Sequence, residues 1–219
     1  MDFLSALITL TILIFSAILH EIAHGYVAER LGDPTARLAG RLTLNPKNHI
    51  DPMMSIALPL ILLLSGSPII IGAAKPVPVD PFNLRDGRKD MALVSLAGPL
   101  TNVLLAIFAS IVIKIIIALY PVFYQNVGAT EVLSILMFFF TAIAKLNLLL
   151  AIFNLIPIPP LDGSKVFSLI LPEKLANTFL SLGSIGMFLI FFLLLSGGQN
   201  SLGRLIFSLL SFSEKLLGL

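Results

Sequence analysis

The chain has 219 residues, of which 57% are hydrophobic and only 12% charged, and its mean hydropathy is +1.01. Soluble domains carry about twice that charged fraction, so the composition excludes a soluble globular protein and predicts a membrane protein. The net charge of +2 gives no reason to expect a nucleic-acid partner. Because the sequence contains no cysteine, any metal site must use histidine and carboxylate ligands.

Four apolar segments are long enough to cross a lipid bilayer. A crossing helix needs about 20 residues, and the segments that meet this requirement are 3–28, 91–120, 131–156 and 177–195. The tail 201–219 is also apolar, but its three charged residues leave open whether it spans the bilayer or lies in the interface. We therefore predict an all-α polytopic membrane protein, a bundle of five to six transmembrane helices.

Lysine and arginine residues are distributed unevenly among the connections between these segments. Eight of them lie between the first two segments, two follow the third, and the connection 121–130 has none. Basic connections stay in the cytoplasm by the positive-inside rule. We therefore predict a multi-pass protein of the cell membrane with its N-terminus outside.

The apolar segment 53–71 is too short to cross. Pro59 and the Ser-Gly-Ser-Pro sequence at 65–68 leave about 14 residues of uninterrupted helix, and basic residues flank both sides. We expect a re-entrant or interfacial hairpin there. The segments 35–44 and 69–79 alternate in polarity or contain β-branched residues and prolines, a pattern typical of edge strands. They predict a small cytoplasmic sheet whose edge an extended substrate could join.

The first apolar segment ends in the sequence His20-Glu21-Ile22-Ala23-His24. Two histidines four residues apart project from one face of a helix, so both can bind one metal ion. Glu21 lies beside them, where a carboxylate can act as a general base without being a ligand. This H-E-x-x-H arrangement is typical of zinc hydrolases, and three ionisable groups within a membrane helix indicate a functional site.

A catalytic zinc site usually has three protein ligands, and two residues are candidates for the third. Asp162 follows the prolines that end the segment 131–156, and our orientation places it level with the two histidines. A carboxylate at membrane depth also needs a partner, which a dication would provide. His49 is the alternative, but its polar, proline-containing surroundings suit a capping or surface role. We favour Asp162.

Together these motifs resemble the site-2 protease family of intramembrane zinc metalloproteases, in its compact bacterial and archaeal form without a PDZ domain. The resemblance is carried by His20-Glu21-x-x-His24, by Asn154 with Asp162-Gly163, and by the segments 45–52, 74–79 and 97–102. It implies one zinc ion per chain, bound by His20, His24 and Asp162, with Glu21 as general base and acid. It further implies that Asn154 contacts the substrate, although Asn154 could instead bond a free carbonyl at its helix end.

The resemblance implies an intramembrane endopeptidase that cuts a transmembrane protein already trimmed by another protease. We expect one domain over 1–219, with a catalytic core at about 1–165 and accessory or gating helices at 177–219. A metal-ion transporter and an inactive scaffold are the alternatives. Two polar residues of the spans have other expected roles: Asn102 is predicted to bridge helices by a buried hydrogen bond, whereas Lys145 has no partner that the sequence identifies.

Overall fold

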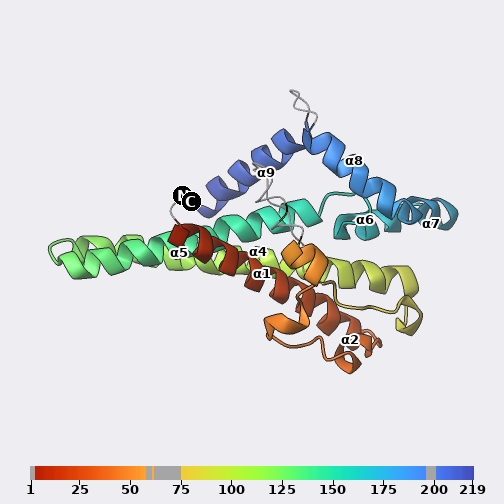
Figure 1. The fold of residues 1–219 in the computed structure, drawn as a ribbon. Coiled ribbons are helices and arrows are strands. Elements are labelled where there is room, and N and C mark those ends of the chain that lie inside the picture. The colour runs from red at the N-terminus through yellow and green to blue at the C-terminus, as the bar shows by residue number, and fades with distance from the viewer. Residues whose placement is uncertain (1–2, 58–60, 62–74, 196–200) are drawn as a thin grey trace.

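The computed structural model describes residues 3–57, 61, 75–195 and 201–219, and most of them are helical (Figure 1). Its centre consists of three long helices that lie side by side, α1 (Phe3–Arg30), α4 (Gly87–Phe123) and α5 (Val127–Asn154). Each is long and apolar enough to cross a membrane, and no other unbroken helix of the described residues is. The protein is therefore a helical membrane protein, but the predicted five to six transmembrane helices are not all present in the described part.

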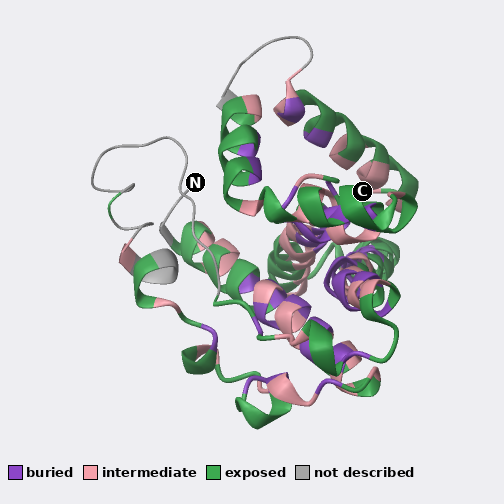
Figure 2. Ribbon diagram, turned by 90° about the vertical axis from the view of Figure 1, so that its right-hand side faces the viewer, coloured by how far each residue is buried: buried purple, intermediate pink, exposed green. Residues whose placement is uncertain are grey.

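Small side chains allow the three central helices to pack closely. Four alanines of α4 and α5, at positions 106, 109, 144 and 151, have at most 2% of their surface exposed, and Ala109 of α4 packs in one cluster with Ala144 of α5. Small residues bring helix backbones together where lipid provides no hydrophobic driving force. The buried residues face inward between these helices, and the outer surface carries exposed leucine, isoleucine and phenylalanine (Figure 2).

The connection from α1 to α4 contains short helical elements instead of the predicted sheet. They are α2 (Thr35–Leu38), η1 (Pro46–Asn48), η2 (Pro52–Ala57) and η3 (Pro81–Asn83). The prediction of a strand at 35–44 is wrong, because the carboxylate of Asp33 accepts a hydrogen bond from the Thr35 N–H and a helical turn begins there. The residues that the structure describes contain no strand.

The other predictions for this connection fall largely on residues outside the description. Of the predicted strand 69–79, only residues 75–79 are described, and they follow an irregular path. Of the predicted hairpin 53–71, the structure describes residues 53–57, within η2, and residue 61. The hairpin therefore stays a prediction.

Beyond α5 the chain forms shorter helices: α6 (Asp162–Phe167), η4 (Ser168–Ile170), α7 (Glu173–Ser181), α8 (Gly183–Leu195) and α9 (Leu202–Leu217). The predicted span 177–195 is not one straight helix, because α7 and α8 meet at Leu182 with a 65° bend. If the bent pair counts as one span, the described residues contain four.

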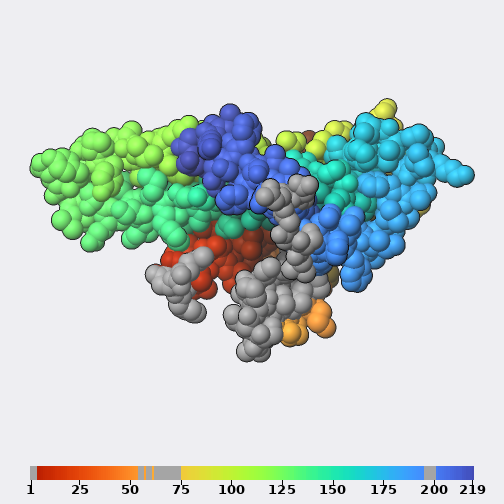
Figure 3. Space-filling view, turned by 90° about the horizontal axis from the view of Figure 1, so that it is seen from above, coloured from red at the N-terminus to blue at the C-terminus, as the bar shows by residue number. Residues whose placement is uncertain are grey.

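Helix α9 lies across the α4–α5 hairpin, as the dark blue atoms over the green ones show (Figure 3). With 16 residues it is shorter than a full crossing requires. Its Glu214 supplies the partner that the sequence did not identify for Lys145, with 3.6 Å between the Lys145 Nζ and a carboxylate oxygen. The C-terminal Leu219 packs on Ile113 and Ala144 below it.

Candidate metal centre

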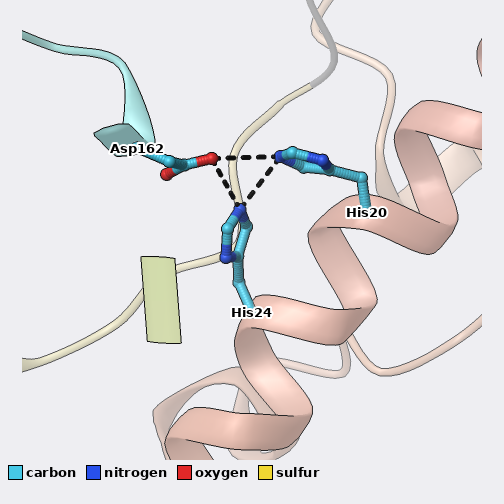
Figure 4. Close-up of side chains that lie close together, drawn as sticks. All are labelled: His20, His24 and Asp162. Carbon is cyan, nitrogen blue, oxygen red and sulfur yellow. Dashed lines mark hydrogen bonds and ion pairs between the residues drawn. The ribbon is translucent and has the colours of Figure 1, made fainter. Parts of the chain in front are cut away.

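Three potential metal ligands converge from two parts of the fold. His20 and His24 project from one face of α1, and Asp162 is the first residue of α6 (Figure 4). The Asp162 Oδ2 lies 3.2 Å from the Nε2 atom of each histidine, and the two Nε2 atoms are 3.0 Å apart. All three residues are buried. The structure thus brings Asp162 to the histidine pair, as the orientation of the spans predicts.

The spacing of these three atoms fits a zinc ion. Zinc binds histidine nitrogen and carboxylate oxygen at about 2.0–2.2 Å. Two ligands of a tetrahedron with such bonds are therefore about 3.3–3.5 Å apart. The observed separations of 3.0 and 3.2 Å need to widen by only a few tenths of an ångström to admit the ion. Among the described residues, these three form the group of histidine and carboxylate side chains that could hold a metal.

The far side of each imidazole ring is held by a hydrogen-bond acceptor. The Nδ1 of His20 lies 2.5 Å from the Asn102 Oδ1, and the Nδ1 of His24 lies 2.7 Å from the Val94 carbonyl oxygen. Because an acceptor faces each Nδ1, that nitrogen carries the proton and the Nε2 lone pair is directed at the centre. Contacts of this kind fix the tautomer and ring orientation of metal-binding histidines.

The contact to His20 is the end of a chain of buried polar side chains. The Asn102 Nδ2 donates to the Asn147 Oδ1 at 2.7 Å, and the Asn147 Nδ2 donates to the Ser16 Oγ at 2.9 Å. Ser16, Asn102 and Asn147 are at most 4% exposed. The predicted helix-bridging role of Asn102 is confirmed, because this chain links α4 to α5 and α1. Its contact with His20 was missed by the sequence analysis, and the one signal that could have found it is the rarity of asparagine within apolar spans.

A glycine of α4 leaves the space that the centre occupies. A Cβ atom at Gly98 would lie 2.5 Å from the Nε2 atoms of both His20 and His24, far inside van der Waals contact. Pro99, which follows it, has no N–H to continue the helical hydrogen bonds and loosens this turn of α4. The Gly98-Pro99 pair therefore lets α1 approach with both imidazole rings against the backbone of α4.

Asp162 is held in place by the turn that precedes it and by a lysine. At Gly163 a Cβ would lie 2.1 Å from the Leu155 carbonyl oxygen, so only glycine lets α6 begin this close to the end of α5. The Lys165 Nζ lies 3.4 Å from the Asp162 Oδ1, the oxygen that does not face the histidines.

A cavity of about 390 Å³ opens beside the three ligands. Glu21 and Asn154 both line it. The Glu21 Oε2 accepts a hydrogen bond from the Val77 N–H at 2.7 Å, a contact that the sequence analysis did not anticipate. The Asn154 amide donates to the Leu150 carbonyl at 2.9 Å, which is the helix-end bond considered as its alternative role. Its contact with a substrate stays a prediction.

The alternative third ligand, His49, is not brought to the histidine pair. Its ring is 2% exposed, and its Nε2 lies 2.8 Å from the Thr43 carbonyl oxygen within the connection between α1 and α4. Its own carbonyl accepts a hydrogen bond from the Lys75 N–H. His49 therefore stabilises this connection as the C-cap of η1, in agreement with the predicted capping role, whereas the predicted surface role is wrong because the residue is buried.

A histidine pair with an adjacent glutamate, a carboxylate from a second element and a bundle of apolar helices define the class of membrane metalloproteases. Residues 8–196 match the family model described as Peptidase family M50, and the chain belongs to this family. It is a zinc metalloprotease of the membrane.

Two relatives are both named "Putative zinc metalloprotease": YwhC of Bacillus subtilis strain 168 and Rip2 of Mycobacterium tuberculosis strain H37Rv. YwhC is 36% identical over 83% of this chain and 77% of its own length. Rip2 is 31% identical over 82% of this chain and 62% of its own length. No solved structure matches the chain.

Proposed function

We propose that this protein is an intramembrane zinc endopeptidase that hydrolyses a peptide bond in or near a transmembrane segment of a membrane protein. The observation that carries the proposal is the convergence of two histidines and an aspartate beside a cavity lined by Glu21, with both histidines on a helix that can cross a membrane. Membership of a metalloprotease family supports the same chemistry.

In this proposal His20, His24 and Asp162 hold one zinc ion per chain, and Glu21 is the catalytic base. Zinc at such a site acts as a Lewis acid that polarises a carbonyl group and makes water more acidic. The carboxylate of Glu21 accepts the proton of the attacking water and later donates it to the leaving amide nitrogen. The Asn102 side chain and the Val94 carbonyl keep the two imidazole rings oriented while this happens.

The substrate has to reach the cavity in an unwound form. The peptide bonds of a transmembrane helix are hydrogen-bonded internally and shielded from water. Cleavage therefore requires an extended stretch of substrate in the cavity, where the Asn154 amide, after leaving the Leu150 carbonyl, would donate to the substrate backbone. From the family resemblance we expect the natural substrate to be a regulatory membrane protein, cut first by another protease.

The distribution of basic residues supports one orientation of the chain. With the basic connections in the cytoplasm, the N-terminus is outside and α1 carries His20 and His24 toward the cytoplasmic side. Asp162 comes after α5, which runs in the same direction as α1, so its position beside the histidines is consistent with that topology.

The Glu21→Gln variant tests the proposed chemistry. Purified wild type and variant are incubated with a panel of single-span peptides in lipid vesicles, with and without a zinc chelator, and the products are sequenced. We expect the wild type to cleave only without chelator and the variant to retain zinc but not cleave. Glu29→Gln is the matched control, because Glu29 is a glutamate of the same helix that pairs with Arg37 and lies outside the cavity lining.

The same experiment separates the alternatives. Cleavage by the Glu21→Gln variant at the wild-type rate would contradict the assigned base. Zinc movement across the vesicle membrane that survives the substitution would favour the transporter.

A further inference from the structure

The segment Lys75–Asp80, which has no regular secondary structure, runs along the cavity and is here called the strap. Pro76, Val77 and Val79 of the strap line the cavity together with Glu21. Proline has no backbone N–H, so within the sequence Pro76-Val77-Pro78 only Val77 can donate a backbone hydrogen bond. That single N–H is the one that reaches the Glu21 Oε2 at 2.7 Å.

Buried charged side chains hold the strap at both ends. The guanidinium group of Arg41 donates to the carbonyl oxygens of Lys75 and Pro76 at 2.6 and 2.9 Å. At the other end the Asp33 carboxylate accepts from the Asp80 N–H at 2.7 Å. Arg41 is 7% exposed and Asp33 is fully buried. Both hydrogen bonds are donated by one guanidinium nitrogen, the Arg41 Nη2.

These anchors determine where the Val77 N–H points. The proline rings restrict the backbone on both sides of Val77, and Arg41 fixes the carbonyl of the residue before it. A hydrogen bond to a carboxylate is stronger than one between neutral groups. One oxygen of the flexible Glu21 side chain is therefore held by a rigid donor, which restricts where the second oxygen can lie.

We propose that the strap is a positioning element for the catalytic base, in which Arg41 holds the Val77 N–H so that it orients the carboxylate of Glu21. Arg41 and Val77 are thus positioning residues, which act on the reaction only through Glu21. This inference rests on the proposed role of Glu21. It extends that role by assigning a function to an arginine outside the cavity lining.

The proposed hydrogen bond between the Val77 N–H and Glu21, and its dependence on Arg41, can be tested without a substrate. Hydrogen exchange is measured on the fragment that contains the strap, in which Val77 lies between two residues without an exchangeable amide. We expect the Val77 N–H to exchange at least about ten times faster in Glu21→Ala and in Arg41→Met than in wild type, which corresponds to the loss of a hydrogen bond to a charged group. Arg37→Met is the matched control, because it removes an arginine of the same connection that pairs with Glu29 instead of the strap.

The functional part is tested by replacing the Val77 amide with an ester, by incorporation of the corresponding α-hydroxy acid. This removes the N–H and keeps the side chain. With a quenched-fluorescent single-span peptide in vesicles, we expect kcat to fall by about 10- to 100-fold, the effect of misplacing a catalytic group by about 1 Å, with KM and zinc content unchanged. Arg41→Met should lower kcat in the same way, and Arg37→Met should not.

The outcomes distinguish this inference from the proposed function. A wild-type kcat in the ester variant, together with an inactive Glu21→Gln variant, would overturn the role of the strap and leave Glu21 as the base. Loss of zinc, or a rise in KM without a fall in kcat, would also overturn it, because the strap would then support the fold or the substrate. Activity in Glu21→Gln would instead overturn the proposed function.

Discussion

The metal centre and the C-terminal helices of this protein are attached to the central bundle in different ways. Around the metal centre, polar side chains of α1, α4 and α5 are buried and hydrogen-bonded in series, from Ser16 through Asn147 and Asn102 to His20. Helix α9, by contrast, is attached by apolar contacts, by the Lys145–Glu214 ion pair and by one hydrogen bond, which the Ser110 hydroxyl group donates to the Leu217 carbonyl at 3.3 Å.

The two regions differ in how tightly their side chains are held in position. An unpaired polar group within a membrane is costly, so a fully bonded buried series has few alternative arrangements. The ion pair and the apolar contacts of α9 do not involve His20, His24 or the acceptors of their Nδ1 atoms. We conclude that the central helices hold the imidazole rings in one orientation, whereas α9 can be perturbed without moving them.

Gly98→Ala should have the largest effect on the metal centre. The new Cβ would lie 2.5 Å from both Nε2 atoms, so the rings must move and the ligands separate. We expect zinc affinity to fall by about 100-fold or more and cleavage to be lost. Isothermal titration with zinc in detergent measures this, and Gly203→Ala, whose Cβ would lie 4.0 Å from its nearest neighbour, should bind like wild type.

Asn102→Leu should have the next largest effect. The substitution leaves the Nδ1–H of His20 without its acceptor in a buried site. Loss of such a partner lowers metal affinity by about 10- to 100-fold, which the same titration would detect. Asn126→Leu is the control, because Asn126 only caps the start of α5. Equal affinities for the Asn102 variant and wild type would show that the buried series does not orient the ring.

The acid sensitivity of the strap should depend on Asp33. Burial raises the pKa of Asp33, but hydrogen bonds from Thr35, Asn83 and the Asp80 N–H outweigh it and lower the pKa below 3.8. A lowered pKa stabilises the fold above the unfolded-state value, and this contribution is lost as the pH falls below about 4 and through the folded-state pKa. The exchange rate of the strap amides in wild type, relative to the rate of an unprotected amide at the same pH, should therefore rise as the pH falls through this range. In Asp33→Asn it should be higher already at pH 7 and depend less on pH.

The smallest effect on the metal centre is expected from a change in the C-terminal region. Glu214→Gln removes one partner of the ion pair with Lys145. We expect zinc affinity and kcat to stay unchanged, while the free energy of unfolding falls by up to about 3 kcal/mol, because Lys145 lies within the span α5 and loses its charged partner. Chemical denaturation in detergent measures the free energy of unfolding. A loss of zinc in this variant would contradict the conclusion that the metal centre does not depend on the contacts of α9.

The sequence predicted the residues of the centre because each carries a local signal. The four-residue spacing of His20 and His24 follows from helix geometry. Asp162 was predicted from the orientation of the spans 3–28 and 131–156. Basic residues follow both spans, so the ends of both lie on the cytoplasmic side. These inferences need no knowledge of how helices pack, and the structure brings the three residues together.

The contacts that support the centre could not be predicted in the same way. Asn102 lies 82 residues from His20 in the chain, and only the packing of α4 against α1 brings its side chain to the ring. The Lys145–Glu214 pair depends likewise on where α9 lies. The strand expected at 35–44 failed because alternation over a short segment is a weak signal, and the Asp33 side chain favours a helical turn there.

The most direct test of this account is the zinc content of purified Asp162→Ala beside wild type and His49→Gln, measured by elemental analysis after dialysis against a weak chelator. The account predicts one zinc ion per chain in wild type and in His49→Gln, and none in folded Asp162→Ala. One zinc per chain in Asp162→Ala, or its loss only in His49→Gln, would contradict the assigned metal centre.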